Sequence, residues 1–72
     1  MSLKSSPQQR LDWIRKAHRI QLEIADLRLL IDVAMGNRPL GDTMKYLAMA
    51  DVHCERAAEE LDTAANNIRS IQ

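Results

Sequence analysis

Apolar residues recur at alternating spacings of three and four along most of the chain. The first half contains the series Trp13, Ala17, Ile20, Ile24, Leu27, Ile31 and Ala34. The second half contains the series Leu47, Ala50, Cys54, Ala57, Leu61, Ala64, Ile68 and Ile71. Residues at these spacings share one stripe of an α-helix, and two such stripes pack against each other as in a coiled coil. The pattern predicts an all-α protein with two long helices.

Capping residues mark where the helices begin and end. Ser6 can cap the first helix, Pro7 suits its first position, and Gln9 completes a capping box. Gly36 is expected to end this helix in the left-handed conformation, and Asp42 is expected to cap the next one. The predicted elements are a helix over about residues 7–35, a turn over 36–42 and a helix over about 43–71, within one domain spanning residues 1–72.

The similar lengths of the two helices and the short turn between them predict an antiparallel hairpin. Each helix has about 29 residues and a length of roughly 43 Å. Folding the chain at the turn places Trp13 beside Ala64, so that a large side chain faces a small one. It also brings the basic segment 10–19 near the acidic segment 51–62, which supports the antiparallel arrangement.

The length and the cysteine content restrict how the chain can be stabilised. It has 72 residues, and chains this short often need disulfides, metal ions or oligomerisation. Cys54 is the only cysteine, which suits a reducing, cytoplasmic setting. The first residues contain no apolar run typical of a signal peptide, and the apolar run 27–35 is too short to span a bilayer. We therefore expect a cytoplasmic protein that does not bind membranes.

No arrangement of residues along the chain resembles an active site or a metal site. His18 and His53 lie far apart along the folded hairpin, and Cys54 lies on the predicted seam between the helices. Ten basic residues balance ten acidic ones, which disfavours a nucleic-acid-binding function because such proteins usually carry excess positive charge. The sequence predicts a non-enzymatic protein without a cofactor or a metal ion.

The first helix carries a second apolar stripe that one partner helix cannot cover. We expect a second copy of the chain to cover it, which forms a symmetric homodimer and a four-helix bundle. The residues predicted for this dimer interface are Leu22, Ala25, Leu29, Val33 and Met44.

Two groups of side chains are predicted to bind a larger bacterial protein. Tyr46, Met49 and Val52 lie near the turn, whereas Arg15 and Arg19 lie toward the other end of the hairpin. Arginine, tyrosine and methionine favour interfaces because they combine a large contact area with polar or adaptable ends. Since the two groups are far apart, we expect the target to contact one end, and we favour the turn end.

Three families share features with this chain. In size, charge-rich helices and spare apolar face, it resembles small phage-encoded proteins that inhibit bacterial host regulators, including anti-activators of quorum-sensing receptors. The segment MGNRPLGDTMKYL is similar to the turn of the hairpin co-chaperones of type III secretion. The hairpin also resembles the RNA-binding four-helix bundles of plasmid copy control, whose basic face Arg15, Lys16 and Arg19 would approximate. We expect the protein-binding inhibitor that the first resemblance implies; a co-chaperone and an RNA-binding dimer are the alternatives.

Overall fold

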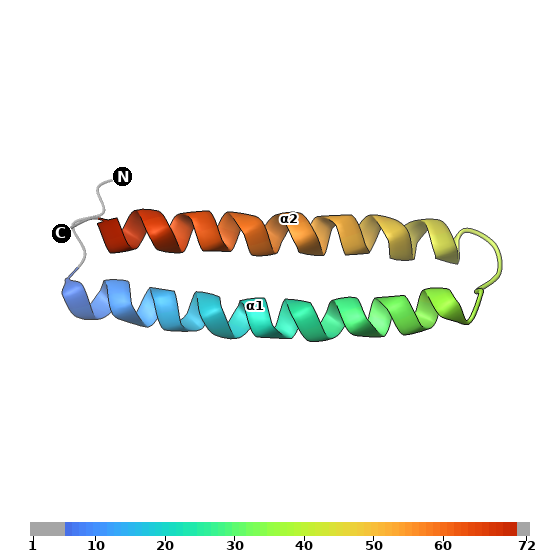
Figure 1. Ribbon diagram of the computed structural model, residues 1–72, viewed down its shortest axis with the longest axis horizontal. Coiled ribbons are helices and arrows are strands. Elements are labelled where there is room, and N and C mark those ends of the chain that lie inside the picture. Colours follow the sequence, from blue (N-terminus) through green and yellow to red (C-terminus); the bar gives the residue numbers. More distant parts are fainter. Residues whose placement is uncertain (1–5, 71–72) are drawn as a thin grey trace.

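The computed structural model describes residues 6–70, which form two α-helices joined by a turn (Figure 1). Helix α1 spans Pro7–Gly36 and helix α2 spans Thr43–Ser70. The helices lie side by side in opposite directions, so the prediction of an all-α antiparallel hairpin is confirmed. Ile71, the last residue of the predicted second stripe, lies outside the described residues.

The start of α1 has the predicted capping box. The Gln9 N–H donates to Ser6 Oγ at 3.2 Å, and the Ser6 N–H donates to Gln9 Oε1 at 2.9 Å. Pro7 occupies the first turn, where its missing N–H costs no hydrogen bond. These contacts satisfy backbone donors that a helix end otherwise leaves free.

The turn leaves the helical conformation later than the sequence predicts. Gly36 is still part of α1, and the residue with a left-handed backbone is Arg38, at φ 51°. The prediction for Gly36 is therefore wrong. The Asn37 N–H donates to the carbonyls of Val33 and Ala34, which keeps Gly36 within α1. The helix then ends before a proline, because proline disfavours the helical conformation of its predecessor.

The second helix begins directly after Asp42. Its first turn is closed by the Tyr46 N–H, which donates to the Asp42 carbonyl at 3.1 Å. Gly41, at φ 68°, supplies the left-handed step that turns the chain into this helix. The sequence therefore predicts the residue at which α2 starts.

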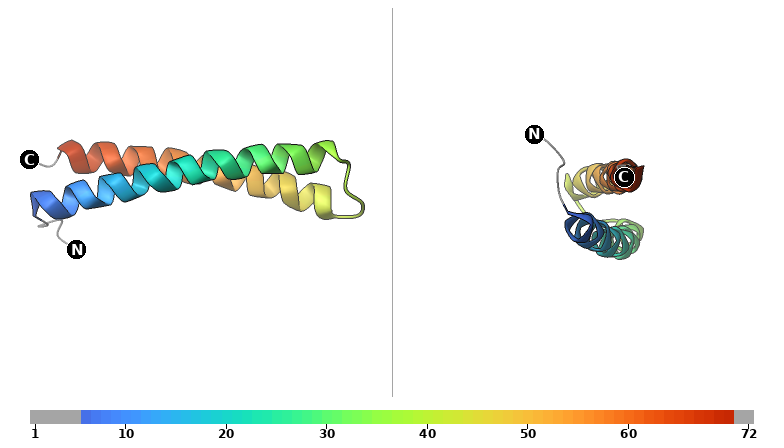
Figure 2. Two further views of the ribbon diagram at one scale, coloured as in Figure 1. Left: turned by 90° about the horizontal axis from the view of Figure 1, so that it is seen from below. Right: turned by 90° about the vertical axis from the view of Figure 1, so that its left-hand side faces the viewer.

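The hairpin is a single layer of two helices, which is plain in the end-on view of Figure 2. Its principal dimensions are 50 × 20 × 14 Å. Among residues 6–70, only Ala17, Ile31 and Ala65 are buried. The accessible surface is 5891 Å², whereas a compact monomer of this mass exposes about 4,500 Å². The chain thus has very little core of its own.

Candidate interaction surfaces

The face of α1 that packs against α2 differs from the predicted stripe. Its buried and half-buried members from the second turn onward are Ile14, Ala17, Gln21, Ile24, Arg28, Ile31, Ala34 and Met35. The prediction is correct for Ala17, Ile24, Ile31 and Ala34. Trp13, Ile20 and Leu27 lie at the edge of this face and are more exposed than predicted, at 39%, 37% and 47%. The flanking row 14, 21 and 28 is covered in place of the row 13, 20 and 27, which turns the centre of the packing face by roughly 50° around α1.

The packing face of α2 agrees better with the sequence. Every predicted seam residue from Leu47 to Ile68 is at least half-buried. Asp51, Ala58 and Ala65 join them, so the contact lies between the predicted row and these added residues. Cys54 is half-buried on this face, as expected for a small seam residue.

Polar contacts between the helices explain the rotation of α1. Arg28 Nε donates to Asp51 Oδ1 at 3.0 Å, and Arg28 Nη2 donates to Asp51 Oδ2 at 3.3 Å. The same Nη2 lies 3.6 Å from Glu55 Oε2. One heptad away, Gln21 Nε2 donates to the Ala58 carbonyl at 3.1 Å. These bonds hold polar side chains in the seam and leave the neighbouring apolar row partly exposed at its edge.

The ion pair between the helices also shifts the ionisation of both partners. The hydrogen bond from Arg28 is the main cause that lowers the pKa of Asp51, with Coulombic attraction adding to it and partial burial opposing it. The same hydrogen bond raises the pKa of Arg28. The acidic partner comes from the predicted acidic segment 51–62, whereas Arg28 lies outside the basic segment 10–19.

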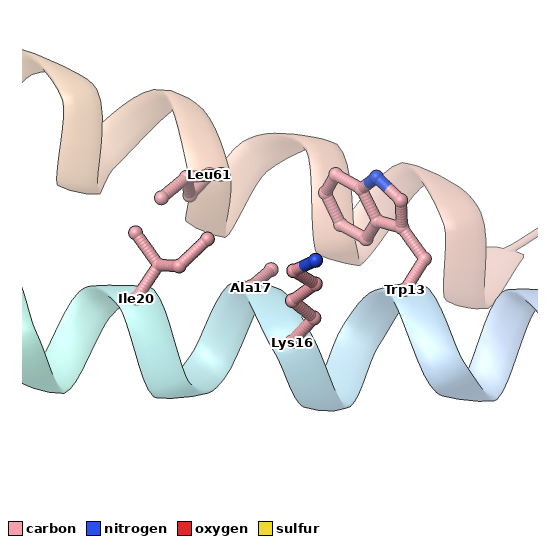
Figure 3. Close-up of a pocket in the computed structure, with 5 residues that line it drawn as sticks. All are labelled: Trp13, Lys16, Ala17, Ile20 and Leu61. Atoms are coloured by element: carbon pink, nitrogen blue, oxygen red, sulfur yellow. The ribbon is translucent and has the colours of Figure 1, made fainter.

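The partly exposed apolar residues of α1 form a row along one side of the hairpin. Residues seven apart share a face in a supercoiled helix, so Trp13, Ile20 and Leu27 form a row along α1. At the end of this row away from the turn, a shallow hollow lies between the helices (Figure 3). It is lined by Trp13, Lys16, Ala17, Ile20 and Leu61. In this view the indole extends toward α2, and the Lys16 side chain stands beside it.

A row of small residues on α2 borders the same side. Leu61 points toward Ile20 in Figure 3 and lies one helical turn from Ala57 and Ala64. Ala50, Ala57 and Ala64 are spaced by seven and are half-buried. The other side of the seam is occupied by the polar contacts of Gln21 and Arg28. We call the two rows together, Trp13, Ile20, Leu27, Ala50, Ala57 and Ala64, the Trp13 face.

The residues predicted for the dimer interface lie elsewhere. Leu22, Ala25, Leu29 and Val33 are exposed and form a strip along α1, which we call the Leu22 strip. Met44 is half-buried at the start of α2 and does not extend that strip. The structure thus brings four of the five residues together, and their role as an interface stays a prediction.

The residues predicted to bind a target fall into two separate groups. Tyr46, Met49 and Val52 are exposed on the outer surface of α2 near the turn. Leu40, in the turn itself, is 91% exposed. Arg15 and Arg19 are exposed on the terminal half of α1. The two groups lie at opposite ends of the molecule, as the sequence predicts.

Two features of the structure are not predicted by the sequence. Leu30 is 65% exposed and extends the apolar surface near the turn, although it belongs to no predicted group. Its signal is the unbroken apolar run around residue 30. The pairing of Arg28 with Asp51 is signalled only by opposite charges at positions that face each other once the hairpin is closed.

The remaining candidate chemical groups do not gather into a site. His18 and His53 are both exposed and lie on different helices. Within residues 6–70, no three His, Cys, Asp or Glu side chains lie close enough together to bind a metal ion. In the same range, neither helix is long and apolar enough to cross a membrane.

Comparison with known proteins gives no relative for this chain. No family model matches it, and no curated protein or solved structure matches it significantly.

Proposed function

We propose that this chain is a non-enzymatic, protein-binding regulator. It acts as a homodimer, a four-helix bundle in the bacterial cytoplasm, and it binds and inhibits a larger bacterial protein. The resemblance to small phage-encoded anti-activators supplies the class of target: a transcriptional or quorum-sensing regulator of the host. The turn end of the hairpin contacts this target.

The observation that carries the proposal is the apolar surface around the turn. Leu40, Tyr46, Met49 and Val52 are all exposed, and within residues 6–70 no further element covers them. Exposed apolar patches on small proteins mark binding sites because their exposure to water is unfavourable. Tyrosine and methionine suit a protein partner, since one adds a hydroxyl and the other a flexible thioether.

The double variant Tyr46→Ala, Met49→Ala tests this surface. We expect it to abolish inhibition in cells that carry a quorum-sensing receptor and a reporter gene under its control. The reason is that a few central side chains dominate the energy of most interfaces. Affinity purification and mass spectrometry from the same cells identify the bound protein. Sedimentation and circular dichroism should show that the variant keeps its mass and helicity.

The matched control for that variant is Arg15→Ala, Arg19→Ala at the opposite end. We expect it to inhibit the reporter and retain the target as the unmodified chain does. Loss of activity in the arginine variant alone would show that the terminal end binds the target. Unchanged activity in both variants would refute the proposed target surface.

RNA binding is the second candidate function, and one observation favours it. Trp13 is partly exposed beside Lys16, with Arg15 and Arg19 exposed nearby, so an aromatic side chain does accompany the basic residues (Figure 3). Aromatic rings next to cations can stack on unpaired bases. RNA binding of this kind weakens steeply with salt. Fluorescence anisotropy with a labelled stem-loop at two salt concentrations separates it from the protein-binding function.

A further inference from the structure

The Trp13 face combines a row of large side chains on α1 with a row of alanines on α2. We propose that this face is the interface of a symmetric homodimer in which both turns lie at the same end. The inference rests on the homodimer in the proposed function and names its face and its topology. It places the second copy on the Trp13 face rather than on the Leu22 strip.

Packing of large on small side chains selects this topology. A symmetric dimer uses the same patch on both subunits. A two-fold axis parallel to the helices places α1 of one copy on α2 of the other, so that Ile20 meets Ala57 of the second copy. An axis perpendicular to the helices places the row of large side chains on the same row of the second copy. It then leaves a gap between the two alanine rows. Close packing without voids favours the first arrangement.

The register within the hairpin fixes which residues meet in the dimer. Gln21 faces Ala58 and Arg28 faces Asp51, so Trp13 is level with the turn of α2 that contains Ala64. A rotation about an axis parallel to the helices does not move residues along that axis. Trp13 of one copy is therefore also level with the turn that contains Ala64 of the second copy. Ala64 there lies in a shallow hollow with Glu59, Glu60, Thr63 and Asn67.

The charges at the border of the face are compatible with a second copy. Lys16, which stands beside Trp13, comes level with Thr63 of the second copy and within one helical turn of Glu60, so opposite charges come close at the rim. The ion pair of Arg28 with Asp51 and Glu55 lies on the other side of the seam and stays in water. The interface thus has an apolar centre and a polar rim, as protein interfaces usually have.

The area available also suits a dimer. The hairpin exposes about 1,400 Å² more than a compact monomer of its mass. A stable interface covers about 800 Å² on each partner. The six residues of the Trp13 face span about 21 Å of the 50 Å hairpin, and the exposed Leu30 extends the apolar surface toward the turn.

The substitution Ile20→Glu tests the face, with Leu29→Glu as the matched control on the Leu22 strip. Sedimentation equilibrium should show that Ile20→Glu weakens the dimer at least about 100-fold, since burying an unpaired carboxylate is costly. Leu29→Glu should leave the dissociation constant within about threefold of the original, a change of less than 1 kcal/mol. Ala57→Leu adds no charge and favours helix, and it should also weaken the dimer because it fills the space that Ile20 occupies.

Spin labels at the turn test the topology. The variant Cys54→Ala, Leu40→Cys carries one label per chain at a position that is fully exposed in the hairpin. Pulsed electron paramagnetic resonance should give a distance between the two labels well below the 50 Å length of the molecule. A distance near that length would overturn the proposed topology.

The outcomes separate this inference from the proposed function. A dimer that Leu29→Glu dissociates and that Ile20→Glu and Ala57→Leu leave intact would overturn the Trp13 face, while the homodimer and target binding would stand. A monomeric unmodified chain would overturn the homodimer itself.

Discussion

Arg28 is the residue that decides which way α1 faces. Its guanidinium bonds both oxygens of Asp51 and lies near Glu55, in the middle of a seam that otherwise holds small and apolar side chains. An arginine positioned between two carboxylates of the partner helix cannot rotate outward without giving up both. Because Leu27 precedes it by one residue, holding Arg28 in the seam places Leu27 at the opposite edge, where it is partly exposed together with Ile20 and Trp13.

The Arg28–Asp51 pair predicts a change of stability in acid. The pKa of Asp51 is lowered in the folded chain, chiefly by the hydrogen bond from Arg28. Its contribution to stability is therefore fully present above the unfolded pKa of about 3.9 and is lost as the pH falls through the lower folded value. Thermal melts followed by circular dichroism should show a steeper loss of stability below about pH 4 for the unmodified chain than for Asp51→Asn.

The comparison with Asp51→Asn removes the contribution of the other carboxylates, since both proteins contain them. Two curves that run parallel from neutral to acidic pH would contradict the assigned role of the pair. Salt should reduce the difference between the curves, because both side chains are partly exposed.

At the scale of the elements, the turn uses its two glycines in opposite ways. Gly36 is helical, whereas Gly41 has φ 68°, a conformation that costs other residues energy. A Cβ atom added at either position would meet nothing within 4 Å. Backbone conformation alone therefore sets the effect of a substitution at these positions.

The same substitution should consequently have opposite effects at the two glycines. Gly36→Ala should raise the free energy of unfolding by about 0.5–1 kcal/mol, because alanine is the better helix former. Gly41→Ala should lower it by about 1 kcal/mol, because alanine is strained at positive φ. Urea denaturation of both variants measures the difference. A change of the same sign in both would refute the conformations assigned to this turn.

The helix boundaries could be predicted because their signals are local. Ser6 and Gln9 lie three residues apart and bond each other, the proline restricts the backbone of the turn, and Gly41 permits its positive φ. The antiparallel pairing follows from equal lengths and a short turn. The left-handed residue that follows α1 is Arg38 and not the predicted Gly36, because the hydrogen bonds of Asn37 keep Gly36 in the helix.

The rotation of α1 could not be predicted in the same way. Apolar residues occupy several rows of this helix, and a periodicity rule selects the row with the largest side chains, which contains Trp13, Ile20 and Leu27. The deciding contact joins Arg28 to a residue 23 positions away on the other helix. The exposed surface near the turn could be predicted, because Tyr46, Met49 and Val52 lie off the predicted seam of α2.

At the scale of the whole molecule, the hairpin has more apolar surface than it can bury. Twelve large apolar side chains within residues 6–70 are more than a third exposed, whereas three residues are buried. A chain of this length gains too little from three buried residues to offset the conformational entropy lost on folding. The homodimer is thus the central element of the proposal: it supplies the missing core and leaves the turn end to bind a target.

Sedimentation equilibrium of the unmodified chain at micromolar concentration tests this most directly. The monomer has a mass of 8.2 kDa, and we expect a mass about twice as large, since the interface is symmetric and closed. The melting temperature should rise with protein concentration, because association stabilises the folded state. A single species of 8.2 kDa that melts cooperatively at a temperature independent of concentration would contradict the homodimer.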